Sequence, residues 1–273
     1  QNKILNVKFL IIVPTLNSYL LLDNLYKSLD KQNFKNWRVL FVDGNSNLKH
    51  KKWIKKICKE NNKFTYKNQS KTNPGIFGAM NDGFLDARLG EWILFLGSDD
   101  WLCNYNSLND LNLNLINLSN NNQLDIAICK AIYVDLLNKR KGRISDFGEN
   151  AKKTRIIEGK EFRKMLYEGY SPAHQATIFG PNLKSKLFRY NTKFKLSADL
   201  EYFLKLSRYK NLKVALVNLN LIYMGSSGVS SKNTFQRLKE VIMAYFLEFK
   251  MFFLIVFIKR YLRKINSLIN SSK

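Results

Sequence analysis

Cysteine and histidine are scarce in this chain, and their scarcity excludes one large class of metal site. The 273 residues include three cysteines and two histidines. Cys58, Cys103 and Cys129 are scattered without the paired spacing that holds zinc, so we expect no Cys/His zinc centre. Scattered cysteines also fit a protein of the reducing cytoplasm.

Two further absences narrow the class of protein. The sequence contains no internal repeat, which argues against a solenoid. It opens with Gln1-Asn2-Lys3 and a strand-like run, without the charged region, long apolar region and cleavage site of a secretory signal, so export is not expected. A chain of this length has room for one large α/β domain or two small ones.

Acidic residues are few relative to basic ones. The chain has 45 Lys and Arg against 21 Asp and Glu, a formal net charge of +24. This excess predicts attraction to a polyanion, which leaves nucleic acid, anionic lipid and phosphorylated substrates open. The chain is also rich in Asn, Lys and Ile, so a composition bias is an alternative source of part of the charge. Because the usual helix-turn-helix, zinc and RNA-binding signatures are lacking, we expect no nucleic-acid partner.

Short apolar runs alternate with helical patterns in the first hundred residues. Strands are predicted at residues 9–13, 37–42, 64–66 and 92–96, and helices at 20–29, around 53–57 and at 76–89. Strands that alternate with helices imply a mostly parallel sheet with right-handed crossovers. Polar or acidic residues directly follow the first, second and fourth strands. Because ligands of open α/β sheets bind at the carboxyl ends of strands, this pattern predicts a site there.

Two adjacent carboxylates follow the fourth of these strands. Gly97-Ser98 ends the apolar run, and Asp99 and Asp100 come next. Paired carboxylates repel each other unless a cation or a proton relieves the repulsion, which favours a hard cation such as Mg²⁺ or Mn²⁺. The alternative is a solvated turn or a helix N-cap.

The middle of the chain is less regular. A helix is predicted over 104–123, a buried strand over 124–133, and a basic loop over 140–153 that serves as a hinge or an acceptor-side segment. A further helix over 195–207 places Asp199 in its first turn. The helix dipole stabilises a carboxylate at that position, which is the structural alternative to a catalytic role.

The last forty residues have a different residue pattern from the rest of the chain. Apolar residues from Leu238 to Val256 follow helical spacing, and Lys259, Arg260, Arg263 and Lys264 come directly after them. This pattern predicts an amphipathic helix over about 235–262 that buries its aromatic face in a membrane interface and presents the basic residues to lipid phosphates. The run is too short to span a bilayer. A core-packing or dimerising helix is the alternative.

Four motifs resemble, in order and spacing, the family 2 glycosyltransferases of the GT-A fold. They are Ile12-Val-Pro-Thr-Leu-Asn17, Phe41-Val-Asp-Gly-Asn-Ser46, Gly75-Ile-Phe-Gly-Ala-Met-Asn-Asp-Gly83 and Phe95-Leu-Gly-Ser-Asp-Asp-Trp101. The resemblance extends more weakly through 172–175 and 198–199 to 228–230, and leaves the C-terminal helix outside. Within the family, the chain is most similar to bacterial enzymes that build surface polysaccharides.

The resemblance implies an α/β GT-A fold, Rossmann-like with a mostly parallel sheet and a C-terminal amphipathic helical tail. Residues 1–230 would form the glycosyltransferase domain, with 1–105 binding the nucleotide sugar and 106–230 the acceptor. Residues 231–273 would form the amphipathic, membrane-associated tail.

The family pattern assigns the nucleotide-sugar site to the strand exits. Pro14, Thr15 and Asn17 would shape the loop around the base, and Asp43 would accept a hydrogen bond from the base edge or ribose. Gly75 and Asn81, both in the third motif, would also belong to this site.

The resemblance also assigns the chemistry. Asp99, with Asp100 beside it, would hold Mg²⁺ or Mn²⁺ against the donor diphosphate, where the cation neutralises the leaving group. Asp199 would be the catalytic base that takes the acceptor's proton, and one displacement would invert the anomeric centre. His174 would reach a phosphate or acceptor group, or else serve as a structural hydrogen-bonding residue.

Several positions depart from the family pattern. Gly97 replaces the first acid of Asp-x-Asp, and Phe77 and Gly78 replace the usual Tyr and Asp of the third motif. Asn73 stands where an acid is common, and Ala198 replaces the acid that usually precedes the base. These changes bear on metal binding and on recognition of the donor sugar, while the base itself is retained.

Together these observations predict a metal-dependent, inverting glycosyltransferase that uses a nucleotide-sugar donor in cell-surface polysaccharide synthesis. The expected acceptor is a glycan linked to a polyprenyl diphosphate, and the expected location is cytoplasmic, peripheral at the inner face of the cell membrane, on an anionic lipid surface. Because of the departures from the family pattern, one alternative function stays open: a catalytically weakened GT-A protein that acts as a partner in a complex. The basic nucleic-acid-binding protein is the less favoured rival.

Overall fold

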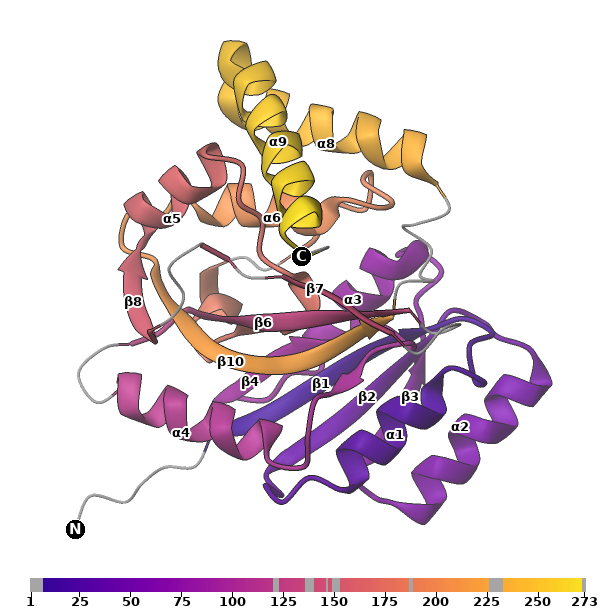
Figure 1. Ribbon diagram of the computed structural model, residues 1–273. Helices are drawn as coiled ribbons and strands as arrows, with labels where there is room; N and C mark the ends of the chain where they lie inside the picture. Colours follow the sequence, from indigo (N-terminus) through magenta and orange to yellow (C-terminus); the bar gives the residue numbers. More distant parts are fainter. Residues whose placement is uncertain are drawn as a thin grey trace.

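The computed structural model describes residues 7–119, 123–135, 140–145, 147–148, 153–186, 189–225 and 233–271. Figure 1 shows a twisted central sheet with helices on both faces, and a pair of C-terminal helices stacked beyond one side. The weakly matching motif at 228–230 lies outside the described residues.

The N-terminal half forms the predicted parallel sheet. Its strands are β1 (Lys8–Thr15), β2 (Trp37–Asp43), β3 (Phe64–Asn68) and β4 (Glu91–Phe95), in the order β3-β2-β1-β4. Three helices connect them: α1 (Leu22–Asp30), α2 (Leu48–Glu60) and α3 (Gly75–Leu85). Alternate residues of β1 pack on opposite faces, with Ile12 in the cluster of α3 and Ile11 in that of α1 and α2. A strand covered on both faces explains the unbroken apolar run.

The second half completes the sheet with antiparallel and parallel strands. Its members are β5 (Trp101–Leu102), β6 (Ile126–Asp135), β7 (Arg140–Ser145), β8 (Arg155–Glu158), β9 (Thr177–Phe179) and β10 (Lys213–Gly225). β9 joins β4 to β6 in antiparallel pairing, and β10 runs parallel to β6. The remaining helical segments of this half are α4 (Ser107–Ser119), α5 (Gly159–Tyr167), α6 (Ala198–Leu206) and the 3₁₀ turns η1 (His174–Ala176) and η2 (Pro181–Lys186).

The prediction of a basic loop over 140–153 is wrong for residues 140–145, which form β7. β7 pairs antiparallel with β6 in a register that sets Ser145 against Ala131. The Arg143 guanidinium lies 4.4 Å from the centroid of the Tyr133 ring, so a cation–π contact holds a basic residue on the strand.

The prediction of one helix over 235–262 is also wrong. The tail folds into α8 (Thr234–Phe249), the 3₁₀ turn η3 (Lys250–Phe252) and α9 (Phe253–Ser271). Lys250 adopts φ +50°, a left-handed conformation that interrupts the helix, and α8 and α9 pack against each other as a hairpin. Figure 1 shows this hairpin stacked on the side of α5 and α6.

The hairpin is anchored to the rest of the protein by both apolar and ionic contacts. Val241, Tyr245 and Val256 are fully or almost fully buried. The Glu248 carboxylate at the end of α8 pairs with Arg163 and Arg208. The tail is therefore packed on the protein along one face, as the core-packing alternative requires.

Three of the four basic residues of α9 that were expected to face lipid phosphates contact the protein instead, which corrects that part of the prediction. Lys259 Nζ donates to both carboxylate oxygens of Glu168 at 3.0 Å, and Arg263 Nε donates to the Glu168 carbonyl at 2.7 Å. Arg260 Nη1 donates to the Tyr245 hydroxyl at 3.2 Å. The backbone of α9 comes so close that a Cβ added to Gly169 would lie 2.5 Å from the Arg260 nitrogen.

Candidate functional site

Thr15 and Asp43 meet at the carboxyl ends of two neighbouring strands. β1 and β2 are parallel with Thr15 opposite Asp43, so both side chains emerge at the same edge. Thr15 Oγ1 donates to Asp43 Oδ1 at 3.3 Å, and the Ser46 amide donates to Asp43 Oδ2 at 3.0 Å. The Asp43 carboxylate is buried and held in one orientation, as a group that recognises a ligand edge must be.

The loop after β1 is tied to two other strand exits. Asn17 takes φ +53°, its amide donates to Ser46 Oγ at 2.8 Å, and its side-chain oxygen accepts from the Asn47 amide at 2.8 Å. The hydroxyls of Ser18 and Ser98 lie 2.7 Å apart, and Ser98 Oγ is 3.5 Å from the Pro14 carbonyl. The predicted base-binding loop is therefore braced against the loops after β2 and β4.

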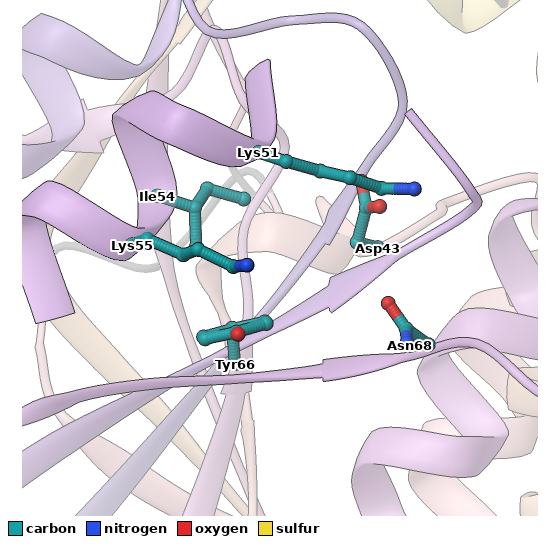
Figure 2. Close-up of a pocket in the computed structure, with 6 residues that line it drawn as sticks. All are labelled: Asp43, Lys51, Ile54, Lys55, Tyr66 and Asn68. Carbon is teal, nitrogen blue, oxygen red and sulfur yellow. The ribbon is translucent and has the colours of Figure 1, made fainter. Parts of the chain in front are cut away.

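A cavity of about 140 Å³ opens beside Asp43. Figure 2 shows Lys51 and Lys55 reaching over it from α2, and Tyr66 and Asn68 rising from β3. An aromatic face, an amide and two cations around a carboxylate suit a planar heterocycle with an attached anion. The sequence prediction missed these four residues, although the end of the third strand at Asn68 was the available signal.

His50, in α2, lies next to the Asp43 carboxylate. It is completely buried, and its Nε2 is 3.5 Å from Asp43 Oδ1. Neither ring nitrogen has a hydrogen-bond partner within the part of the chain that the structure describes. Burial lowers the pKa of His50, and the Asp43 charge opposes that shift only in part, so the ring is neutral at pH 7.

Asp99 and Asp100 lie at the exit of β4 but have different surroundings. Asp100 is buried; its Oδ2 accepts from the Gly97 amide at 2.7 Å and its Oδ1 from the Gly225 amide at 3.3 Å. Asp99 is partly exposed, and a Cβ added to Gly225 would lie 2.5 Å from its Oδ2. Gly225 ends β10, so the last strand of the sheet closes the acidic turn.

The electrostatics of this pair match a cation site. Burial and the Asp99 charge raise the pKa of Asp100 to about 7, although the amides of Gly97 and Gly225 oppose the shift. Burial also raises the pKa of Asp99. Among the described residues, no three His, Cys, Asp or Glu side chains cluster to hold a metal by themselves. A single acidic pair is nevertheless enough for Mg²⁺ or Mn²⁺ that shares its coordination with substrate phosphates.

Helix α3 carries the third sequence motif and packs against its neighbours. Asn81 Oδ1 accepts from the Tyr190 amide at 2.8 Å, and its Nδ2 donates to the Tyr190 carbonyl at 3.0 Å. The Asn81 amide thus ties α3 to residue 190. Gly75 begins α3 with φ +82°. A Cβ on Gly78 would collide with the Asn73 carbonyl, which explains why no acid stands at 78.

His174 is enclosed by aromatic rings. Its Nε2 lies 2.6 Å from the Tyr190 hydroxyl, and its ring stacks on Phe95 with centroids 5.5 Å apart. Burial lowers the pKa of His174 to about 3, so the ring is neutral. This environment favours the structural role of His174 over contact with an acceptor.

Asp199 lies in the first turn of α6, as predicted, close to the Tyr190 side chain and to Arg237 and Arg260 of the hairpin. Burial raises the pKa of Asp199, while the Leu200 amide and the two arginines oppose the shift. A raised pKa makes the carboxylate a stronger base once it is ionised.

Glu240 of α8 fixes the backbone that leads into α6. Its Oε1 accepts from the Lys195 amide at 2.9 Å, and its Oε2 accepts from the amides of Leu196 and Ser197 at 2.8 and 2.9 Å. Ser197 is the N-cap of α6 but makes no side-chain cap. Glu240 therefore supplies the cap from another helix, and no local sequence signal indicates this contact.

Comparison with known proteins identifies the family of the chain. A family model described as glycosyl transferase family 2 matches residues 10–179. The chain is 34% identical over 95 residues to the GalNAc(5)-diNAcBac-PP-undecaprenol beta-1,3-glucosyltransferase of Campylobacter jejuni. That match covers 35% of this chain and 30% of the Campylobacter protein, so it spans about a third of the relative.

Solved structures show the same fold. TarS of S. aureus in complex with UDP-GlcNAc superposes with a TM-score of 0.67 at 22% identity, covering 88% of this chain and 67% of that one. The mannosyltransferase PcManGT from Pyrobaculum calidifontis, in complex with GDP-Man and Mn²⁺, gives 0.63 at 13% identity, covering 98% and 73%.

Proposed function

The chain belongs to glycosyl transferase family 2 and has the GT-A fold, and from this premise we propose that it is an inverting, metal-dependent enzyme that transfers a sugar from a nucleoside-diphosphate sugar to a lipid-linked glycan. One observation carries the proposal: Asp43 and the Asp99–Asp100 pair lie at the carboxyl ends of β2 and β4, the two strands that flank β1, with Asp43 beside a cavity.

The donor would bind across this edge. Its base would lie against Tyr66 in the cavity, and Asp43 would accept a hydrogen bond from the base or ribose. Asp99, with Asp100 beside it, would hold Mg²⁺ or Mn²⁺, which when bound neutralises charge on the leaving diphosphate. TarS and PcManGT bind UDP-GlcNAc and GDP-Man respectively, which supports a nucleotide-sugar donor.

Asp199 would act on the acceptor. Its ionised carboxylate takes the proton of an acceptor hydroxyl as that oxygen attacks the anomeric carbon from the face opposite the phosphate. The bond from the anomeric carbon to the diphosphate oxygen breaks in the same displacement, so the configuration inverts. Asp199 then holds the proton, and the nucleoside diphosphate leaves with the bonding electrons.

The nature of the acceptor is suggested by one relative and by the tail. The Campylobacter enzyme is named for an undecaprenol-diphosphate-linked glycan. An acceptor of that kind would hold this chain near a bilayer, in polysaccharide synthesis at the inner face of the membrane.

Activity is tested by donor turnover. The full chain, incubated with Mn²⁺, a panel of UDP- and GDP-sugars and a bacterial membrane lipid extract, should release nucleoside diphosphate from one donor and add one sugar mass to a lipid in the extract. EDTA should abolish both signals. Donor hydrolysis without transfer would mean the extract lacks the acceptor. No turnover of any donor would favour the weakened partner protein instead.

The tail exposes a stripe of apolar side chains that could contact a bilayer. The exposed large apolar residues of α9 recur at helical spacing: Leu254, Ile255, Ile258, Leu262 and Ile265. Met251 and Phe252 at the turn of the hairpin are 91% and 58% exposed. A continuous exposed apolar stripe of this kind marks a membrane or protein contact.

We infer that the hairpin lies in the membrane interface, with this apolar stripe facing the lipid acyl chains. The segment Thr234–Asn266 has a window of mean hydropathy 2.2, which satisfies the length and composition of a spanning helix. However, Lys250 breaks the segment, and the opposite face of α9 is bound to Glu168 and Tyr245. A helix with one exposed apolar face and one face bound to the protein is suited to lie along the membrane surface rather than to span the bilayer.

Vesicle flotation tests this orientation. Replacing Ile258 and Leu262 by serine should lower the fraction bound to vesicles about tenfold or more, because each side chain contributes about 1 kcal/mol or more on burial in lipid. The matched control replaces Leu20 and Leu89, which are 78% and 98% exposed on the sheet domain, and should float as the parent does. Equal flotation of all three proteins would contradict the inferred orientation.

A further inference from the structure

His50 is a fully buried polar side chain whose two ring nitrogens have no hydrogen-bond partner among the residues that the structure describes. Buried polar groups in folded proteins are nearly always hydrogen-bonded, and burial without a partner costs free energy. An apolar side chain would occupy such a position without that cost. The nearest charged group is informative, because it is Asp43, the residue that the proposed function assigns to the nucleotide base.

Local structure returns the chain from Asp43 to His50 over a short loop. β2 ends at Asp43, and α2 begins at Leu48. Asn47 is the N-cap of α2, and its side-chain oxygen accepts from the His50 amide at 3.0 Å. This cap fixes the first turn of the helix, and the His50 ring then lies with Nε2 3.5 Å from Asp43 Oδ1. Lys51, the next residue, reaches over the cavity that Asp43 lines (Figure 2).

The two oxygens of the Asp43 carboxylate are held differently. Oδ2 accepts from the Ser46 amide at 3.0 Å, an ordinary hydrogen-bond distance. Oδ1 has two side-chain neighbours at longer range, Thr15 Oγ1 at 3.3 Å and His50 Nε2 at 3.5 Å. Long contacts of a functional group often shorten when its ligand binds. Oδ1 is therefore the oxygen whose position His50 can adjust.

The His50 ring is suited to donate a hydrogen bond rather than to form an ion pair. Burial lowers the pKa of His50, and the Asp43 charge opposes that shift only in part, so the neutral ring carries one N–H. A neighbouring carboxylate favours the tautomer whose N–H faces it, and Nε2 is the nitrogen that faces Asp43. Because the ring is fully buried, it acts on a ligand only through Asp43.

We propose that His50 is a positioning residue, whose Nε2–H donates to Asp43 Oδ1 and orients the carboxylate that accepts a hydrogen bond from the nucleotide base. The assignment rests on the proposed function, because it requires Asp43 to contact the base or ribose. A neutral donor leaves the negative charge on Asp43, so the base meets a charged acceptor, which forms the stronger hydrogen bond. His50 lies outside the four motifs that resemble the family.

NMR of the imidazole rings tests this contact in the unaltered protein. The chain has two histidines, so comparison with His50→Gln assigns both rings. Addition of UDP with Mg²⁺ should move the His50 Nε2–H signal downfield, because the hydrogen bond to Asp43 shortens. GDP replaces UDP if the parent binds GDP more tightly. His174, whose Nε2 is 2.6 Å from the Tyr190 hydroxyl, is the internal control and should shift far less. Pyrophosphate with Mg²⁺ has no base and should leave the His50 signal in place.

Nucleotide affinity measures the same contact by substitution. His50→Leu should weaken binding of the nucleotide about tenfold, the loss expected for one hydrogen bond to a charged group, and change pyrophosphate binding little. His50→Gln keeps an amide donor near the position of Nε2 and should retain most of the affinity. In an Asp43→Asn background, His50→Leu should cause little further loss, because the two residues act as one unit. The matched control is Ile57→Ala, which removes a buried side chain from the same helix and should bind as the parent does.

The outcomes distinguish positioning from a purely structural role. Equal loss of nucleotide affinity in His50→Leu and Ile57→Ala, or equal loss of nucleotide and pyrophosphate binding in His50→Leu, would overturn the proposal. A His50 signal that stays in place when nucleotide binds would also overturn it, and this measurement decides if His50→Leu does not fold.

The same experiments keep the proposal separate from the proposed function. A parent chain that binds neither UDP nor GDP would refute the nucleotide site and the role of His50 with it. Nucleotide binding that depends on His50, in a chain that turns over no donor, would retain the positioning role and refute the proposed enzyme.

Discussion

Replacing Asp199 by asparagine should lower turnover by about two to four orders of magnitude and leave donor binding intact, the range that general base catalysis supplies. Asparagine keeps the shape of the side chain but cannot accept the acceptor's proton. Steady-state kinetics with the donor and lipid identified by the panel assay measure the loss, and titration with nucleoside diphosphate measures donor affinity.

The control for this variant is Glu201→Gln. Glu201 lies on the same helix, and its buried Oε2 has no hydrogen-bond partner among the residues that the structure describes. The charges of Lys205 and Arg208 act on it. Its replacement should change turnover far less than that of Asp199. A normal rate in Asp199→Asn with a large loss in Glu201→Gln would move the base to Glu201.

The pH profile gives a second readout. The pKa of Asp199 is raised, so the carboxylate becomes ionised at a higher pH than an ordinary aspartate. Turnover should therefore rise with pH through this raised pKa, and the rise should disappear in Asp199→Asn. A merely structural role for Asp199 would lower the rate without removing the dependence on pH.

Replacing Asp99 by asparagine should abolish the metal-dependent part of donor binding. Asp99 is the partly exposed member of the acidic pair, whereas both oxygens of Asp100 already accept amide hydrogens. Calorimetric titration with nucleoside diphosphate, with and without Mn²⁺, checks this. Asp23→Asn, at an exposed acid paired with Lys27, is the control and should bind as the parent does. Metal-stimulated binding that survives in Asp99→Asn would exclude Asp99 as the ligand.

Metal binding to this pair should be linked to protons. The pKa of Asp100 is about 7, above that of an unfolded aspartate, so the folded protein retains a proton there between the two values. Stability of the metal-free protein should accordingly fall as pH rises through this window and level off above 7. A cation favours the ionised pair, so its affinity should increase over the same window.

Sequence patterns predicted the parts of the fold that depend on local order. The apolar runs predicted β1, β2 and β4, because each of these strands is buried on both faces. The polar residues that follow them predicted the positions of Thr15, Asp43 and the acidic pair at the strand ends. The first turn of α6 gave the position of Asp199. Which of these residues act in catalysis stays a prediction.

The wrong predictions concern segments whose structure depends on contacts between residues far apart in the sequence. β7 has a polar sequence, and its strand conformation depends on pairing with β6. The charges of α9 were expected to face outward, but Glu168 and Tyr245 provide partners for them on the protein. Gly225 donates to Asp100 across 125 positions of sequence, which no periodicity can reveal.

The cap that Glu240 provides has a practical consequence for expression boundaries and fusion tags. The amides of Lys195, Leu196 and Ser197 share this one carboxylate as their acceptor. A shortened protein that ends before α8 would lack Glu240 and leave these amide donors without an acceptor. Each amide that stays buried would then lower the free energy of unfolding by about 1–3 kcal/mol. A soluble variant is better obtained by replacing the outward side chains of α9 and keeping its backbone.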